Sequence, residues 1–395
     1  MSLTRNREAR DPLARKRVHH VPPGLRSQAA HALSARAARG AFELQSCRDC
    51  RTATWPPRDI CPVCWGELGW TAQPAGATLV AETTIRVTTD PYFRDHLPWR
   101  IGTVALDAGP MAIAHLHGAL GVGDRAVLRL MLDRGGNAAL FAIPEGALDV
   151  TDRQWRQFVV PIEGRTILVT DGASATGQAV VAALAAAGAG TIVAGMPPPA
   201  RAVPAGALPH GVLAVPLDLT DAGSLKRCLT LVPGPLDIVV NTARHVRTGG
   251  AGPVELARML DVAVIGLTRL IAATAPMLAG RPAGAFVDLL SIEALVPGPG
   301  AAFAAAEAAR HALVRSLRDE MRDAGVRVLS VFAGPIEDED HQSAPLPRLA
   351  PARLAKGVVD ALANGREQSA VGDIAEDGMA RWLADPALYE REKNR

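Results

Sequence analysis

The residues with the clearest chemistry are four cysteines in two C-x-x-C pairs: Cys47, Cys50, Cys61 and Cys64. In each pair two thiolates can bind one ion, and two pairs together complete a tetrahedral site of four sulfurs. Because sulfur fills all four positions, no position is left for a substrate, and the ion is predicted to be a structural zinc. Two disulfides, or an iron site with the same four cysteines, are the alternatives.

A second candidate site lies in residues 165–177, where an apolar strand breaks into a turn of small residues and a helix begins. The free backbone N–H groups at such a helix start suit a phosphate group. The turn reads Thr170-Asp-Gly-Ala-Ser-Ala-Thr-Gly177. It resembles the T-G-x-x-x-G-x-G turn of short-chain dehydrogenases/reductases, and about 210 residues keep that family's order of landmarks. The resemblance implies a fold that binds NAD(P) and transfers a hydride.

Two departures from that turn weaken the predicted nucleotide site. Asp171 takes the position of the first glycine, and Ala175 that of the second. Alanine fits, but a carboxylate facing a pyrophosphate repels it by about 1 kcal/mol in water and by several in a drier site. As a structural turn, with Asp171 or Ser174 capping the helix, the segment is satisfactory. The resemblance implies these cofactor-binding residues: Gly172, Ala173, Gly177, Asp218 and Asn241.

The other nucleotide landmarks are incomplete. In the family, the second strand ends in an acid for the adenosine ribose or in a base for a 2′-phosphate. Here it ends in Ala194-Gly-Met-Pro197, which has neither, and Arg201 is the nearest basic candidate. Asp218-Leu-Thr resembles the adenine-side element, and Asn241-Thr-Ala partly matches N-A-G, although both are also ordinary strand ends. The sequence therefore disfavours bound NAD(P).

The catalytic residues that the resemblance implies are mostly replaced. The family uses a Tyr as acid/base, a Lys four residues later, a Ser about a dozen residues earlier and an Asn on the preceding helix. Ser291 is retained, whereas Phe303 takes the Tyr position, Glu307 the Lys position and Ala263 the Asn position. Phe303 has no proton to give, and Glu307 has the wrong charge to favour a phenolate. Loss of a positioned acid/base alone costs about 10²–10⁴ in rate, so we expect a dehydrogenase-like domain without its reaction.

No other tyrosine is expected to replace the missing one. Tyr92 lies among the short strands of the first half, and Tyr389 begins a Y-x-x-x-K that ends at Lys393. We expect this second pair to belong to a charged tail, residues 376–395. The remaining reactive side chains are expected to be solvated or packed: His245, His311 and Cys228.

The elements that must position the second candidate site alternate between strand and helix. This alternation predicts a doubly wound parallel sheet of Rossmann type over residues 165–375, after a linker at 151–164. Cofactors in this architecture bind at the carboxyl ends of the strands. The main helices are expected over residues 177–187, 254–278 and 301–324.

The first half of the chain has a different pattern. Five short strands without a helical period predict a small closed barrel, with strands over residues 78–87, 100–106, 111–116, 126–132 and 138–143. Together with the cysteine pairs, the FELQSC lead-in and Trp55-Pro-Pro-Arg58, they resemble a group in which a rubredoxin-like zinc ribbon is fused to an OB-fold. Members of that group accompany thiolases and related acyl-CoA enzymes as non-catalytic subunits. The resemblance implies a ribbon at 41–70, an OB-fold at 71–150, a thiolase-like partner and acyl-CoA.

The bulk properties limit the other possibilities. A chain of 395 residues with 48% hydrophobic and 21% charged residues is globular and long enough for several domains. Residues 1–40, a basic arm and helix, carry nine Lys/Arg against two acids. The arm lacks the apolar core of a secretory signal, and the longest apolar run, 179–195, suits a buried helix and strand, so we expect a cytoplasmic protein without a membrane span.

Three functions remain open at this point. The first is an accessory subunit of a thiolase-like complex, with a homodimer formed through the dehydrogenase-like domain. The second is a working NAD(P)-dependent reductase of acyl-CoA or polyketide-like substrates that uses another acid. The third is a nucleic-acid binder, which we disfavour because aromatic residues are 4% of the chain and single-strand binders need stacking platforms.

Overall fold

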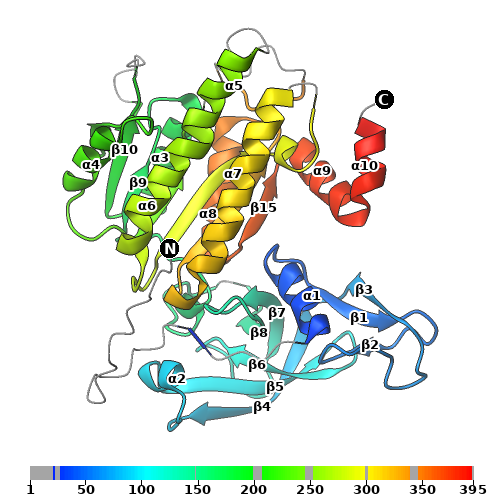
Figure 1. Ribbon diagram of the computed structural model, residues 1–395. Helices are drawn as coiled ribbons and strands as arrows, with labels where there is room; N and C mark the ends of the chain where they lie inside the picture. Colours follow the sequence, from blue (N-terminus) through cyan, green and yellow to red (C-terminus); the bar gives the residue numbers. More distant parts are fainter. Residues whose placement is uncertain are drawn as a thin grey trace, which may run out of the picture.

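The computed structural model describes residues 21–22, 27–146, 148–198, 207–244, 252–298, 301–338 and 346–393. Three parts follow one another along the chain: a small cysteine-bearing sheet, a closed barrel and a large α/β domain (Figure 1). This order confirms the predicted fold class of zinc ribbon, small barrel and doubly wound sheet.

The first part is a three-stranded antiparallel sheet in the order β2-β1-β3. Helix α1 precedes it and is capped by Ser27, whose side chain accepts a hydrogen bond from the Ala30 N–H. Leu33 of α1 and Leu44 of β1 are buried in the same apolar cluster as the barrel core. The ribbon therefore shares its core with the barrel. The elements are α1 (Gln28–Ala37), β1 (Glu43–Cys47), β2 (Ala53–Thr54) and β3 (Leu68–Ala72).

The barrel closes in the order β4-β5-β6-β8-β7, and β4 pairs with β7. All pairs are antiparallel except β6 with β8. Alternate residues of β5 are buried, which is the period of two that a strand needs to fill a barrel on one face. The elements are β4 (Gly76–Ile85), α2 (Pro91–Asp95), β5 (Trp99–Leu106), β6 (Met111–Leu116), β7 (Arg125–Leu132) and β8 (Ala138–Pro144).

Residues 151–164, expected as a linker, are packed against the barrel. Trp155, in the 3₁₀ turn η1 (Trp155–Gln157), and Phe158 are each 2% exposed. Phe141 of the barrel contacts both rings edge-on, with centroids 5.3 and 5.0 Å away. The aromatic residues of this segment therefore join the barrel core, and the connection is a fixed part of the fold.

The α/β domain has a seven-stranded parallel sheet in the order β11-β10-β9-β12-β13-β14-β15. One face packs on α3 and α8, and the other on α4, α6 and α7. Strand β13 is buried along its whole length, as expected for a strand covered on both faces. The strands are β9 (Thr166–Val169), β10 (Thr191–Met196), β11 (Leu213–Pro216), β12 (Ile238–Asn241), β13 (Ala285–Ser291), β14 (Arg327–Ala333) and β15 (Gln368–Val371).

The helices of this domain agree with the predicted order, but two predicted helices differ in extent, and the one expected over 301–324 ends at Glu320 before a 3₁₀ turn. The helix expected over 254–278 is divided by a π-helical turn, η2 (Asp261–Gly266). The helices are α3 (Ala175–Ala186), α4 (Ala222–Thr230), α5 (Pro253–Leu260), α6 (Leu267–Leu278), α7 (Ala301–Glu320) and α8 (Pro351–Ala363), with 3₁₀ turns η3 (Ile292–Ala294) and η4 (Arg322–Ala324). No helix among the described residues is both long and apolar enough to cross a membrane.

The C-terminal segment is folded, in contrast to the expected charged tail. It forms α9 (Asp373–Ala384) and α10 (Pro386–Lys393). Tyr389 is 9% exposed, and Lys393 Nζ donates a hydrogen bond of 2.8 Å to the Val296 carbonyl. A buried ring and an anchored lysine thus hold α10 against the main domain, which the charge pattern of the segment did not indicate.

The barrel and α1 contact the α/β domain at the amino ends of its strands. Arg327, the first residue of β14, donates hydrogen bonds of 3.2 Å to the carbonyls of Leu132 in the barrel and of Phe158. The Ala38 carbonyl after α1 accepts hydrogen bonds from the N–H groups of Glu367 and Gln368, at 2.9 and 3.0 Å. The ribbon and barrel therefore lie on the side opposite to the carboxyl ends of the sheet (Figure 1).

Candidate functional site: a four-cysteine centre and the carboxyl ends of the sheet

The four cysteines converge at the end of the ribbon. All four sulfurs lie within 4.8 Å of one another, and the closest pairs join the two knuckles: Cys47 to Cys64 at 3.3 Å and Cys50 to Cys61 at 3.7 Å. Tetrahedral zinc with bonds of 2.3 Å needs sulfurs roughly 3.8 Å apart. The geometry therefore fits the predicted structural zinc, and all five cysteines of the chain are free of disulfides.

The pKa values of the thiols also indicate a place for a cation, because the four sulfurs hinder one another's ionisation. Hydrogen bonds from the Thr52 side chain and backbone lower the pKa of Cys50 to about 6. The Gly66 N–H favours the Cys64 thiolate, yet the sulfurs of Cys47 and Cys50 raise the pKa of Cys64 to about 12. Four thiolates this close repel one another, and a bound divalent cation removes the conflict.

The turn between β9 and α3 already contains an anion of its own. Asp171 Oδ1 accepts hydrogen bonds from the N–H groups of Ala173 and Ser174, at 3.0 and 3.1 Å. Ser174 Oγ accepts a third from the Gly177 N–H, at 3.1 Å, and so caps α3. N–H groups of this turn that a pyrophosphate would need are thus bonded to protein oxygens.

Packing alone accounts for the glycines of this turn. A Cβ on Gly177 would lie 1.7 Å from the Asp171 carbonyl oxygen, and a Cβ on Gly172 would lie 2.7 Å from Ala194 Cβ. Gly177 therefore allows α3 to start directly against the turn, and Gly172 allows the turn to approach β10. Their presence does not require a cofactor.

Asp218 and Asn241, two further predicted nucleotide residues, are also bonded within the protein. Asp218 Oδ1 accepts hydrogen bonds from the N–H and hydroxyl of Thr220, at 2.8 and 2.7 Å. Asn241 Oδ1 accepts one from Thr170 Oγ1, at 2.7 Å. Strand β10 ends at Met196 and is followed by Pro197, with no acid at this strand end, and Arg201 and His245 lie outside the described residues.

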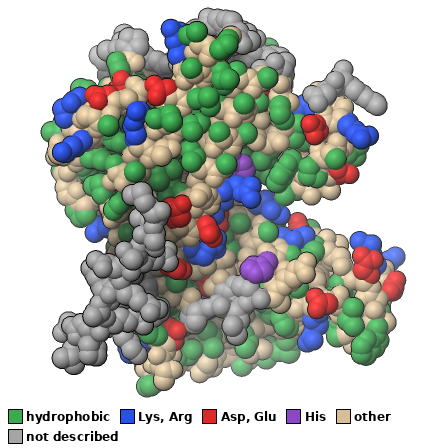
Figure 2. Space-filling model, in the orientation of Figure 1, with side chains coloured by type: hydrophobic (Ala, Val, Ile, Leu, Met, Phe, Trp, Pro, Cys, Tyr) green, Lys and Arg blue, Asp and Glu red, His purple; other side chains and the backbone are tan. Residues whose placement is uncertain are grey.

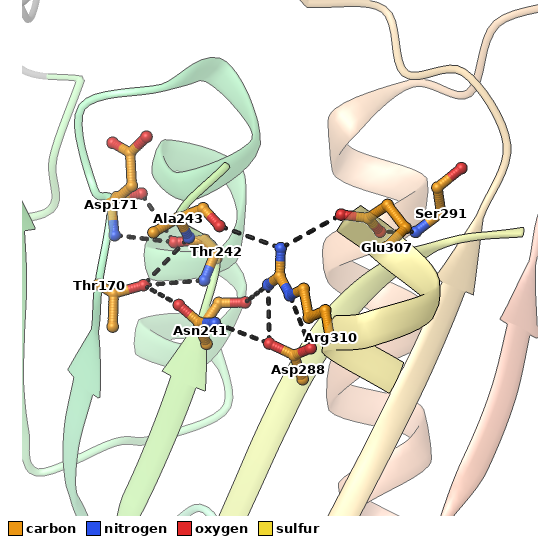
Figure 3. A network of polar contacts seen from close by, with 9 residues as sticks. All are labelled: Thr170, Asp171, Asn241, Thr242, Ala243, Asp288, Ser291, Glu307 and Arg310. Carbon is orange, nitrogen blue, oxygen red and sulfur yellow. Dashed lines mark hydrogen bonds and ion pairs between the residues drawn. The ribbon is translucent and has the colours of Figure 1, made fainter. Parts of the chain in front are cut away.

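A buried ion network crosses the carboxyl ends of the central strands (Figure 3). Arg310 of α7 contacts Asp288 of β13 through two hydrogen bonds, of 2.8 and 2.7 Å, and both side chains are 0% exposed. Asn241 Nδ2 donates to Asp288 Oδ1 at 2.7 Å, and Arg310 Nη1 donates to the Ala243 carbonyl at 3.1 Å. The network thus ties β12, β13 and α7 together.

Glu307 extends this network to Ser291. Its carboxylate lies 3.6 Å from Arg310 Nη1 and accepts a hydrogen bond of 2.6 Å from the Ser291 N–H. Burial alone would lower the pKa of Arg310, but the charges of Asp288 and Glu307 raise it. Burial raises the pKa of Asp288, yet the double contact with a guanidinium needs its carboxylate form. The residue at the lysine position therefore serves as an ion-pair partner.

The other predicted catalytic positions do come together, but as an apolar cluster. Ala263 of η2 is 6% exposed and packs with Met259 and Ala306, and Phe303 packs against the same residues. Ser291 Oγ accepts a hydrogen bond of 3.2 Å from the Glu293 N–H, which makes it the cap of η3. Among the described residues at these positions, only Ser291 carries a hydroxyl.

Sequence reasoning missed three charged residues at the carboxyl ends of these strands. Asp288 stands inside the apolar run AFVDLLS, and Arg310 follows Glu307 by one helical turn; a charge in a buried strand was the available signal. Arg244 follows Asn241-Thr-Ala, and its terminal nitrogens are buried with no hydrogen-bond partner among the described residues. Burial lowers the pKa of Arg244, and the nearby Glu307 carboxylate opposes that change.

The other reactive side chains singled out from the sequence are packed inside the protein. His311 is buried edge-on against Phe332, and burial lowers its pKa to about 4, so it is a packed neutral ring. Cys228 is a buried thiol whose pKa burial raises to about 11. Tyr389 lies against Gly378 of α9. A Cβ on Gly378 would lie 2.9 Å from the Tyr389 hydroxyl.

The family models and relatives agree with this geometry. Residues 165–345 match the short chain dehydrogenase model, and residues 34–69 match "ChsH2, rubredoxin-like zinc ribbon domain". A 1-deoxy-11-beta-hydroxypentalenate dehydrogenase of Streptomyces exfoliatus is 34% identical over 206 residues, which cover 47% of this chain and 73% of that protein. The chain belongs to the short-chain dehydrogenase family. Its N-terminal part is a zinc ribbon domain joined to a five-stranded barrel.

Two further relatives extend the comparison of the short-chain dehydrogenase domain. A short chain dehydrogenase of Pseudocercospora fijiensis is 30% identical over 195 residues, 46% of this chain and 63% of that protein. A Burkholderia cenocepacia short chain dehydrogenase, solved in complex with NADP, matches with a TM-score of 0.53 at 25% identity and covers 59% of this chain and 98% of that one. The short-chain dehydrogenase domain is therefore present in full outline.

Replacing Asp171 with glycine in this short-chain dehydrogenase domain is expected to tighten NADPH binding about fivefold or more. The substitution removes a carboxylate that occupies the turn N–H groups and repels a pyrophosphate by about 1 kcal/mol or more. Equilibrium binding, followed by NADPH fluorescence, measures the change. Asp171→Asn is the matched control, because it removes the charge but keeps the side chain, and it should give a smaller gain. Equal affinities of the wild type and Asp171→Gly would contradict the prediction.

Proposed function

We propose that this chain is a non-catalytic accessory subunit of a thiolase-like acyl-CoA enzyme, in which the short-chain dehydrogenase domain serves as a scaffold. The observation that carries the proposal is the ion network at the former active site. Glu307, at the lysine position, bonds the Ser291 N–H and pairs with Arg310, while Phe303 packs in an apolar cluster. A proton transfer of the family's kind has no donor among these side chains.

The residues at the predicted nucleotide-binding positions support the same proposal. Asp171 satisfies the N–H groups of Ala173 and Ser174, and Asp338 Oδ2 accepts a hydrogen bond of 3.3 Å from Thr176 Oγ1 on the first turn of α3. Two carboxylates therefore lie where a dinucleotide would place its own negative charge. Repulsion between them and a pyrophosphate disfavours NAD(P).

The tip of the zinc ribbon exposes apolar side chains that a partner protein could bind. Val63 and Trp65 are 64% and 76% exposed, and Ile60 beside them is 47% exposed. Trp65 has a left-handed backbone with φ of 67°, and so has Arg51, with φ of 59°, at the same place in the other knuckle, so this conformation belongs to the knuckle turn. The support for a partner is the exposure itself, because a large exposed aromatic side chain is typical of an anchor for another protein.

Replacing Trp65 with alanine is expected to weaken the thiolase complex by about 2 kcal/mol, which is roughly thirtyfold in Kd. Titration calorimetry with a thiolase that co-purifies with this chain measures the loss. Val87→Ala is the control, since Val87 is 87% exposed on the barrel, away from the ribbon tip. Unchanged affinity in Trp65→Ala, with the zinc content intact, would remove the ribbon tip from the interface.

The experiment that tests the accessory role itself is reconstitution. The full chain, mixed with a candidate thiolase from the same genome, should elute as one complex in size-exclusion chromatography and should be inert by itself. Two separate peaks at micromolar concentrations would count against the proposal.

The barrel supports the accessory role further, because five strands with a single parallel pair fit an OB-fold. We place this complex in the cytoplasm, with acyl-CoA as the ligand of the assembled enzyme.

A homodimer within that complex is part of the proposal. The outward face of α7 carries small residues, Ala305, Ala308 and Ala312, and Ile265 in η2 is 46% exposed beside it. Figure 2 shows apolar side chains across the part of the surface that α6 and α7 form in Figure 1. Small exposed residues let two such helices approach closely, so this face fits a second copy of the chain.

One observation favours the reductase alternative. Tyr389 and Lys393, the Y-x-x-x-K of the C-terminus, pack beside the turn that follows Ser291, and Lys393 bonds the Val296 carbonyl. If this pair were the acid/base, Tyr389→Phe would abolish NADPH-dependent reduction. We expect no NADPH-dependent turnover in the wild type or in Tyr389→Phe, since the Tyr389 hydroxyl faces Gly378. A nucleic-acid role is disfavoured, and salt-sensitive retention of oligonucleotides would be its signature.

A further inference from the structure

An apolar cavity of about 510 Å³ lies where residues 150–163 meet the α/β domain. Its walls come from this segment, from the end of α3 and from the end of α8. Trp155, Val159 and Ile162 form the floor and are buried, while Ala186 and Ala363 stand exposed at the edge. Volume and apolar lining match those of small-molecule sites, which often occur at domain junctions.

This cavity is separate from the predicted nucleotide site. It contains Glu163 and Gly188, which lie at the amino end of β9 and the end of α3, whereas that site lies at the carboxyl ends of the strands. Its floor is also fixed, since Trp155 packs on Phe141 of the barrel core and the Val160 N–H donates a hydrogen bond of 3.0 Å to the Leu362 carbonyl. A preformed apolar space is therefore available without movement of either domain.

The charges in the cavity indicate the sign of a ligand. Arg156 lines it, is partly buried, and its guanidinium has neither a hydrogen bond nor an ion pair with any described residue. An unpaired guanidinium beside an apolar space can form charge-assisted hydrogen bonds with an incoming anion. Glu163 is the other charged residue of the lining, but it is exposed, so solvent screens its charge.

We propose that this cavity binds an amphipathic anion, a hydrocarbon chain that ends in a carboxylate, with its chain on Trp155 and Val159 and its head group on Arg156. The site does not depend on the accessory role or on NAD(P). Its chemistry follows from the apolar walls, which favour a hydrocarbon chain by roughly 25 cal/mol per Å² of buried surface. The single unpaired cation at the wall then fixes the orientation of the chain.

Decanoate is the probe, titrated into the full zinc-loaded chain by calorimetry below its micelle concentration. Saturable binding at one site is expected. Arg156→Gln should weaken it about tenfold or more, because a hydrogen bond to a charged group is lost. Ala186→Trp, at the exposed edge of the cavity, should abolish binding without unfolding the domain. Lys356→Gln on α8 is the matched control, since Lys356 pairs with Asp360 and does not line the cavity.

Three results would overturn this inference. The first is the absence of binding at millimolar decanoate. The second is binding that Ala186→Trp leaves unchanged, which would place the ligand elsewhere. The third is tighter binding of decyltrimethylammonium than of decanoate, which would mean that Glu163, and not Arg156, sets the preferred charge. Thermal melts of each variant show whether a loss of binding reflects unfolding.

Discussion

Replacing Arg310 with methionine is expected to lower the free energy of unfolding by about 3–5 kcal/mol. The guanidinium is 0% exposed and contacts Asp288, Glu307 and the Ala243 carbonyl. Its removal leaves two buried carboxylates without their cation, and each must then be protonated or hydrated on folding. Urea denaturation followed by circular dichroism measures the change in free energy.

Two further variants distinguish the effect of breaking the ion pair from the effect of losing a long side chain on α7. Arg315→Met lies on the exposed face of the same helix α7 and should change the free energy of unfolding by less than about 0.5 kcal/mol. Asp288→Leu combined with Arg310→Met replaces both charges by apolar groups and should recover part of the loss, because replacing a whole buried pair is often neutral. A single Arg310→Met variant as stable as the wild type would mean that the network is not structural.

Replacing Cys61 with alanine is expected to remove the bound zinc and to unfold the ribbon. Cys61 is 0% exposed, and its sulfur lies 3.7 Å from that of Cys50. Structural zinc contributes apparent binding free energies of about 10–16 kcal/mol in zinc-finger peptides at neutral pH. With three ligands left, the small sheet β2-β1-β3 has no core of its own large enough to stay folded. Zinc content by mass spectrometry and protease sensitivity within residues 41–70 measure the two effects.

Cys228→Ala provides the control for the cysteine substitution. Cys228 is also 0% exposed but packs in the core of the α/β domain, far along the chain from the other four. Its loss should cost about 1 kcal/mol of stability and no zinc. A Cys61→Ala protein that retained its full metal content and resisted protease would contradict a four-sulfur structural site. Iron in place of zinc would revise the metal but not the geometry.

Much of the fold could be predicted because each element depends on local signals. Two C-x-x-C pairs determine a shared metal site whatever surrounds them, and the sulfurs converge as expected. The strand from Met111 to Leu116 was predicted at its observed bounds, since turns that contain glycine bound this short apolar run on both sides. Alternating strands and helices predicted the parallel sheet, which confirms the doubly wound architecture.

The rest depended on contacts between residues far apart in the sequence. The double contact of Arg310 with Asp288 joins a helix to a strand 22 residues earlier. Tyr389 and Lys393 stand in a charged segment, and nothing local shows that the turn after Ser291 receives them. Residues 151–164 had the composition of a linker, yet Trp155 and Phe158 complete an aromatic core whose other half is Phe141.

We propose that the short-chain dehydrogenase domain supports an assembly and does not transfer a hydride. The most direct measurement is the oxidation of NADPH and of NADH by the purified, zinc-loaded chain, with a panel of acyl-CoA and keto substrates. Without a tyrosine at the Phe303 position, we expect no rate above that of the buffer, and the same result for Tyr389→Phe. Turnover at about 1 s⁻¹ or more, in the range of ordinary enzymes, would contradict this proposal.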